Sequence, residues 1–138
     1  MALTYWAAVA DLTPIQGELQ AQIMAALWRL GTGTVEQVRS ELPSRYRGAY
    51  TTVQTVLNRL AERDLLARHR EGRGIVYEPS LSEADYLSGT IRHTLAGASS
   101  DARQAALANI IGGMDTVELS QLQALAKRAG KARRRQRS

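Results

Sequence analysis

The fold of this chain is decided by residues 49–60, which run Ala49-Tyr50-Thr51-Thr52-Val53-Gln54-Thr55-Val56-Leu57-Asn58-Arg59-Leu60. Apolar residues recur there at three- and four-residue steps, the spacing of one helix face, at Val53, Val56, Leu57 and Leu60. The opposite face carries hydroxyls, amides and one guanidinium: Thr51, Thr52, Gln54, Thr55, Asn58 and Arg59. The pattern predicts an amphipathic helix over residues 50–63.

The polar face of this helix has the chemistry of a surface that binds the major groove of DNA. Base edges in that groove present hydrogen-bond donors, acceptors and thymine methyl groups, which amide, hydroxyl and guanidinium side chains can match. No acidic residue, which the phosphates would repel, occurs between Leu42 and Leu60. An ordinary solvent-exposed helix face is the alternative, although such a face usually mixes charges of both signs.

Two further helices are predicted upstream. Thr13-Pro14-Ile15-Gln16 has the form of a capping box with proline at the first helical position, and the apolar periodicity then continues to a glycine stop at Gly31. Thr34-Val35-Glu36-Gln37 repeats the capping-box pattern, and Pro43 ends this second, short helix.

A β-hairpin is predicted downstream, with strands over residues 65–70 and 75–78 around a turn over residues 71–74. Helix, helix, helix and hairpin, in that order, predict a winged helix-turn-helix domain over residues 1–80, in a chain that is mainly α with a small β-hairpin wing. Arg68, Arg70 and Arg73 on the wing are candidates for phosphate or minor-groove contacts, or serve only solubility.

The rest of the chain is predicted to be a helical dimerisation region, residues 81–129, followed by a disordered basic tail, residues 130–138. Helices are expected over residues 82–94, 101–111 and from 115 onward. They carry more apolar residues than short helices can cover alone, so these residues either form a homodimer interface or pack on the winged domain: Leu87, Ile91, Leu95, Leu107, Ile110, Ile111, Leu119, Leu122 and Leu125.

Composition narrows the possible functions. The chain has 138 residues, a net charge of +5 and no cysteine, which excludes disulfides, thiolate nucleophiles and cysteine-ligated metals. The only histidines, His69 and His93, have no partner at a spacing typical of a metal site or catalytic triad. The sequence thus predicts a protein that is not an enzyme and needs no cofactor or metal. With no signal peptide or membrane span predicted, the expected location is cytoplasmic.

Residues 49–60, with Leu65-Leu66 after them, resemble the DNA-binding helix of the BlaI/MecI-type repressors of penicillinase and methicillin resistance. Glu18-Leu19 and Ala26-Leu27-Trp28 extend the resemblance upstream. It implies a homodimeric transcriptional repressor on a palindromic operator, often of TACA/TGTA sequence. Family members contact DNA at the positions of Thr52, Gln54, Thr55 and Arg59, with Tyr50 and Thr51 at the start of the helix.

The same resemblance suggests how repression is relieved. Antibiotic-responsive members are cut by an inducing protease after an asparagine that precedes an aromatic residue, and the matching pair here is Asn109 and Ile110. Ile110 replaces the aromatic residue, so Asn109 is alternatively only a helix-surface residue. Copper-responsive members use cysteine pairs, which this chain lacks.

Two functions other than sequence-specific repression are also compatible with these residues. The winged helix could be a protein-protein interaction module, which the acid-free polar face of residues 50–60 argues against. The chain could instead be an architectural DNA-binding protein with little sequence preference, which the basic tail favours and Gln54 and Asn58 disfavour.

Overall fold

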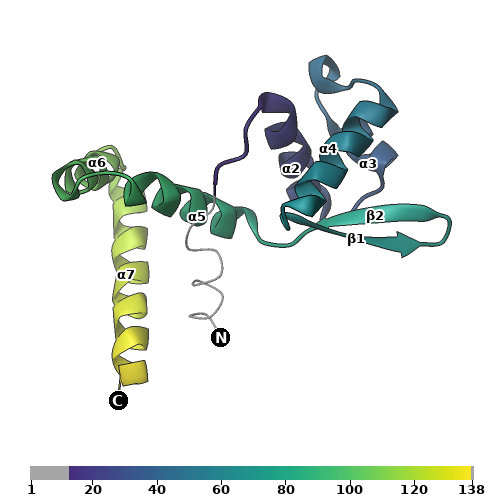
Figure 1. The fold of residues 1–138 in the computed structure, drawn as a ribbon. Helices are drawn as coiled ribbons and strands as arrows, with labels where there is room; N and C mark the ends of the chain where they lie inside the picture. Colours follow the sequence, from purple (N-terminus) through teal and green to yellow (C-terminus); the bar gives the residue numbers. More distant parts are fainter. Residues whose placement is uncertain (1–12, 138) are drawn as a thin grey trace. The chain divides into compact units, whose positions relative to one another are not determined.

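The structure is a computed structural model that describes residues 13–137, and it divides into two compact units, one ending at Ala96 and one beginning at Gly97 (Figure 1). The first unit contains α2 (Glu18–Leu30), α3 (Val35–Glu41), the 3-10 turn η1 (Ser44–Tyr46), α4 (Tyr50–Glu62), β1 (Leu66–Glu71), β2 (Gly74–Pro79) and α5 (Glu83–Ala96). The second contains α6 (Ser100–Gly112) and α7 (Thr116–Arg137).

The core of the first unit is aliphatic and is built by α2, α3 and α4 with the base of the hairpin. The predicted stripe of α4 is buried throughout, and it packs with apolar residues of the other elements: Ile23, Met24, Leu27, Val38, Leu42 and Leu66. β1 and β2 pair antiparallel with Arg68 opposite Tyr77, and Tyr77 also exchanges backbone hydrogen bonds of 2.9 Å with Gly33. The predicted winged helix-turn-helix is confirmed.

The predicted helix ends are partly confirmed. Thr34 forms the full capping box with Gln37, and Gly31 ends α2 with φ of +81°. The capping box predicted at Thr13 is wrong, because α2 begins only at Glu18, after Gly17. Long-range contacts hold the preceding residues outside the helix: the Thr13 carbonyl accepts from Arg63, and the Ile15 N–H donates to the Tyr86 hydroxyl.

Helix α5 belongs to the first unit, although the sequence grouped it with the helical region that follows. Tyr86 lies against Trp28 with ring centroids 5.4 Å apart, and the Trp28 indole N–H donates to the Leu81 carbonyl at 3.0 Å. These contacts link the start of α5 to α2, and the two compact units divide between Ala96 and Gly97.

The second unit has two capped helices and no buried core among its described residues. Ser99 caps α6, and the Asp115 carboxylate accepts the Glu118 N–H at the start of α7. α7 continues to Arg137, where the sequence predicted a disordered tail from residue 130. Alanine, lysine, arginine and glutamine all favour helix, and cations at a helix C-terminus are favourable toward its dipole, which outweighs the single Gly130.

Candidate nucleic-acid interface

The predicted DNA-binding face of α4 is open to solvent. Tyr50, Thr51, Thr52, Thr55 and Arg59 are exposed, and Gln54 is half-buried beside them. The Thr55 hydroxyl donates to the Thr51 carbonyl at 2.8 Å, so it can only accept hydrogen bonds from a ligand. The face therefore offers a ligand the amide of Gln54, the hydroxyls of three further side chains, the acceptor hydroxyl of Thr55 and the guanidinium of Arg59.

Two arginines fix the connection that leads into α4. Arg39 Nε donates to the Gly48 carbonyl at 2.7 Å, and Arg47 donates from Nη2 to the carbonyls of Leu42 and Ser40. These hydrogen bonds set the position at which α4 begins. Arg45 instead stacks on the Tyr46 ring, 4.7 Å from its centroid, and remains exposed.

A polar cluster joins α4 to the hairpin. The side-chain oxygen of Asn58 accepts one hydrogen bond from the Tyr77 hydroxyl at 2.8 Å and another from Arg68 Nη1 at 2.7 Å. Tyr77 is buried, and this burial raises the pKa of its hydroxyl above the usual tyrosine value, although the nearby Arg68 charge opposes the shift. Asn58, Arg68 and Tyr77 form what we call the helix–wing cluster.

The helix–wing cluster gives two of the predicted DNA contacts, Asn58 and Arg68, a structural role as well. The Asn58 oxygen already has two donors, and Arg68 points to α4, so both residues hold the wing against the helix. Tyr77 is not predictable as a site residue, because its partner Asn58 lies 19 residues away and no local pattern links the two. The alternation of side chains along β2 was the one available signal.

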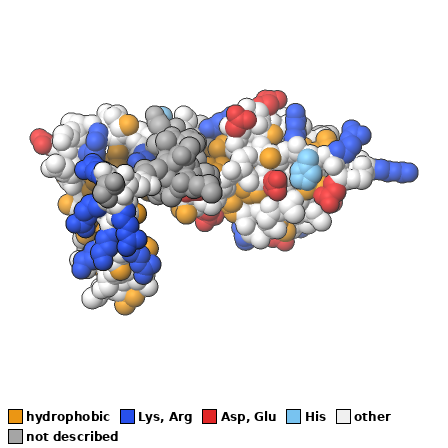
Figure 2. All heavy atoms as spheres, turned by 90° about the horizontal axis from the view of Figure 1, so that it is seen from below, with side chains coloured by type: hydrophobic (Ala, Val, Ile, Leu, Met, Phe, Trp, Pro, Cys, Tyr) orange, Lys and Arg blue, Asp and Glu red, His pale blue; other side chains and the backbone are white. Residues whose placement is uncertain are grey.

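The remaining wing arginines are exposed. Arg70 lies two residues after Arg68 on β1 and so shares its face of the strand, while Arg73 lies in the turn after Gly72, whose φ is +63°. Figure 2 shows the basic side chains at the end of the hairpin. Exposed arginines thus occur on the polar face of α4, along β1 and at the turn of the wing, where Glu71 also lies.

The predicted dimerisation residues are largely uncovered. Leu87 and Ile91 on α5 are about half exposed, and so are Ile110 on α6 and Leu125 on α7. Leu107, Ile111 and Leu122 are exposed too, whereas Leu95 and Leu119 are partly buried. Asn109, the residue before the predicted cleavage point, lies on the exposed surface of α6.

The described residues show neither a metal site nor a membrane span. No cluster of three histidine, aspartate or glutamate residues that could hold a metal ion occurs within residues 13–137. No helix in the same range is long and apolar enough to cross a membrane.

Comparison with known proteins shows which family the chain belongs to. The sequence model described as "Penicillinase repressor" matches residues 16–128. The chain belongs to this family. It is 39% identical over 105 residues to the transcriptional regulator BlaI of Mycobacterium tuberculosis, and this match covers 75% of each chain. It is also 31% identical over 74 residues to the penicillinase repressor of Bacillus licheniformis, a match that covers 54% of this chain and 58% of the other.

Solved structures of the family include the monomeric BlaI of Bacillus licheniformis in complex with the blaP half-operator. It is 30% identical to this chain, with a TM-score of 0.46, and the match covers 55% of this chain and 93% of the other. Family membership makes the chain a transcriptional repressor with a winged-helix DNA-binding domain, and its relatives are named as regulators, not as enzymes.

Proposed function

We propose that the chain acts as a cytoplasmic homodimer that binds a palindromic operator and represses transcription by occupying the promoter. The observation that carries this proposal is the exposed polar face of α4, which has no acidic residue from Tyr50 to Leu60 and lies next to a wing with three arginines. Two copies related by a two-fold axis would place two such faces about 34 Å apart, one turn of DNA, and so double the contacts with a symmetric site.

Within each half-site, residues of α4 divide by chemistry. Thr52 and Gln54 contact base edges, and Thr55 accepts a hydrogen bond or packs its methyl group on thymine. Tyr50 and Thr51 lie at the start of the helix, close to the backbone of the DNA. Arg59, Arg70 and Arg73 contact phosphates, with Arg59 also able to bond a base. Asn58 and Arg68 position the wing.

The homodimer is supported by the exposed apolar residues of the second unit. None of the described residues of α6 or α7 is buried, although α6 carries leucine and isoleucine side chains and α7 carries leucines. Exposed apolar surface of this extent is typical of a protein-protein interface. A second copy of α6 and α7 would cover it.

The operator proposal can be tested with a duplex that the full chain selects from a random-sequence pool. Selection of an inverted repeat, bound at least about a thousandfold more tightly than a scrambled duplex, is expected. Gln54→Ala should lower this preference by about 1–3 kcal/mol, with the loss confined to one base-pair position of each half-site. Gln104→Ala, an exposed glutamine on α6, is the matched control.

The other outcomes point to the rival functions. Equal binding to selected and scrambled duplexes would indicate an architectural DNA-binding protein. No binding to either would indicate a protein-protein interaction module. A Gln54→Ala loss that is uniform over all sequences would contradict base contact by Gln54.

For induction we propose cleavage between Asn109 and Ile110 by an inducing protease. Both residues are exposed, but they lie within the hydrogen-bonded part of α6, where the Asn109 carbonyl accepts from the Gly113 N–H at 3.1 Å. The last turn of α6 must therefore open before a protease can bind it. Mass spectrometry of the repressor from cells exposed to a β-lactam should show a break at this bond, and an intact chain during induction would contradict it.

A further inference from the structure

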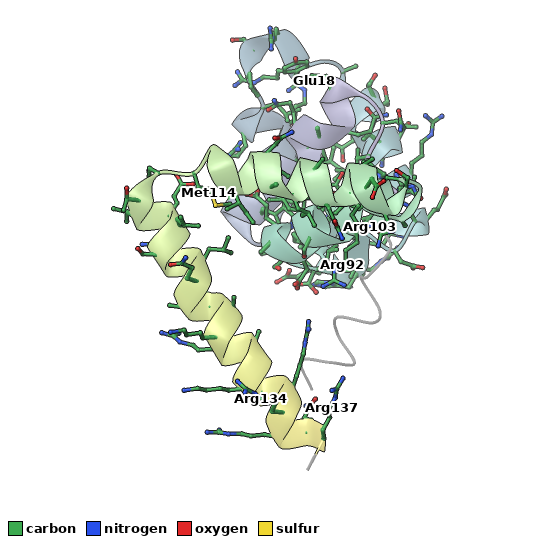
Figure 3. The ribbon with its side chains drawn as sticks, turned by 90° about the vertical axis from the view of Figure 1, so that its left-hand side faces the viewer. Glu18, Arg92, Arg103, Met114, Arg134 and Arg137 are labelled. Atoms are coloured by element: carbon green, nitrogen blue, oxygen red, sulfur yellow. The ribbon has the colours of Figure 1, made fainter. Side chains whose placement is uncertain are left out.

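The C-terminal half of α7 carries a dense group of basic side chains that the winged-helix domain does not explain. Seven lysine and arginine residues lie between residues 127 and 137, and no acidic residue follows Glu118. Because α7 is helical to Arg137, these charges have fixed positions around its axis. Figure 2 shows them as a concentrated blue surface, and Figure 3 labels Arg134 and Arg137 among them.

Helical geometry places five of these seven charges on one face of α7. At about 100° per residue, Lys127, Arg128, Lys131, Arg134 and Arg135 fall within an arc of about 120°. We call this arc the α7 basic face. Arg133 and Arg137 lie outside it.

The opposite side of α7 is apolar as far as Ala132, beyond which it carries Arg133 and Arg137. Leu119, Leu122 and Ala126 begin a stripe there, which Ala129 and Ala132 continue toward the C-terminus. If the stripe is covered by a second copy, as the proposed dimer requires, the basic face points outward in both protomers. As far as Ala132, the amphipathic pattern thus separates a surface for a protein partner from a surface for a polyanion.

We propose that the α7 basic face is a second DNA site, which binds phosphates of the duplex without base specificity. The inference rests on the proposed function, since it requires a chain that binds DNA. From Lys127 to Arg135 the face is about 12 Å long, at 1.5 Å per residue. Duplex DNA carries a phosphate charge about every 1.7 Å along its axis, so the face spans several phosphates.

Electrostatics within the helix favour an anionic partner. Lys127 and Lys131, like Lys131 and Arg135, are like charges at i and i+4, which repel each other on a helix surface. A phosphate backbone along the face removes this repulsion, and the counterions it releases make binding depend on salt. An anionic membrane surface would offer similar charges, but the opposite stripe ends in alanines and has no aromatic residue for insertion into lipid.

The test uses the full chain with three basic-face residues neutralised: Lys127→Gln, Arg128→Gln and Lys131→Gln. Glutamine keeps a helix propensity close to that of lysine and arginine. The matched control removes the same charge outside the face: Arg103→Gln, Arg133→Gln and Arg137→Gln. Binding to the selected duplex and to a scrambled duplex, each extended by about one helical turn on either side, is measured over a series of salt concentrations.

Binding by the basic-face variant should depend less on salt: on both duplexes, the slope of log K against log salt concentration should be shallower by at least about 1. The control variant should keep the wild-type slope. The ratio between the two duplexes should not change. Equal slopes in the wild type and the basic-face variant would overturn the proposal. An equal decrease of the slope in the basic-face variant and in the control would overturn it too, because it would show that only the net charge matters. Unchanged slopes with lost binding to anionic phospholipid vesicles would assign the face to a membrane.

These outcomes are separate from failure of the operator proposal. A wild-type chain that binds both duplexes equally contradicts sequence-specific repression, yet its salt slope still reports on the basic face. A chain that prefers the selected duplex but whose slope the basic-face substitutions leave unchanged contradicts only the second site.

Discussion

Tyr77 on β2 connects the hairpin both to α4 and to the segment between α2 and α3. Its backbone pairs with Gly33, its ring is buried, and its hydroxyl donates to Asn58 on α4. Together with Arg68, this hydroxyl attaches the wing to the DNA-binding helix through Asn58. Removal of this hydroxyl should therefore change both the stability of the domain and the position of the wing.

Tyr77→Phe tests the strength of this attachment, because it removes the hydroxyl and keeps the buried ring. Loss of one buried hydrogen bond should lower the free energy of unfolding by about 1–2 kcal/mol, as measured by urea denaturation. Tyr50→Phe, on an exposed tyrosine, should change it by less than about 0.5 kcal/mol. Equal effects of the two substitutions would contradict the role of the helix–wing cluster.

The same hydroxyl predicts a dependence on alkaline pH. Burial raises the pKa of Tyr77 in the folded state above that in the unfolded state, so the unfolded chain loses this proton first. The contribution of Tyr77 to stability is then complete below about pH 10 and is lost as the pH rises further. The difference in unfolding free energy between wild type and Tyr77→Phe should shrink above about pH 10. A difference that grows there would contradict this assignment.

At the scale of the element, α4 carries a core face and a ligand face on neighbouring residues. Val56→Asp places an unpaired charge in the core and should unfold the domain. Thr55→Asp makes the equivalent change on the exposed face, so the chain should fold but lose most of its DNA affinity through repulsion by phosphates. Circular dichroism and DNA titration of both variants check this. A folded Val56→Asp, or a Thr55→Asp that binds DNA normally, would contradict the assignment of the faces.

What the sequence predicted well depends on contacts between near neighbours. The capping box of Thr34, the stripe of α4 and the glycine turn of the hairpin all rest on residues a few positions apart, and the structure contains each of them. Hydrophobic periodicity and turn chemistry suffice for such features.

What the sequence did not predict depends on distant contacts. The start of α2 is set by Arg63 and Tyr86, which bind residues 13 and 15 from 50 and 71 positions away. The double role of Asn58 follows from Arg68 and Tyr77 in the same way. The polar face of α4 was found from composition, but the residues that position it were not.

At the scale of the molecule, dimerisation should depend on the apolar stripe of α7. Leu122→Glu with Leu125→Glu places charges on this stripe and should yield monomers in sedimentation experiments, with much weaker operator binding. Ser120→Glu with Gln123→Glu adds the same charge away from the stripe and should leave the oligomeric state unchanged. A wild-type chain that is monomeric at concentrations that saturate the operator would contradict the homodimer.

The central claim is that two copies of α4 bind a symmetric operator. A footprint of the full chain across the DNA upstream of its own gene tests this claim most directly. The account predicts protection of two inverted half-sites centred about one helical turn, or about 34 Å, apart, and loss of that protection with Thr55→Asp. Diffuse protection without dyad symmetry, or protection that Thr55→Asp leaves unchanged, would contradict it.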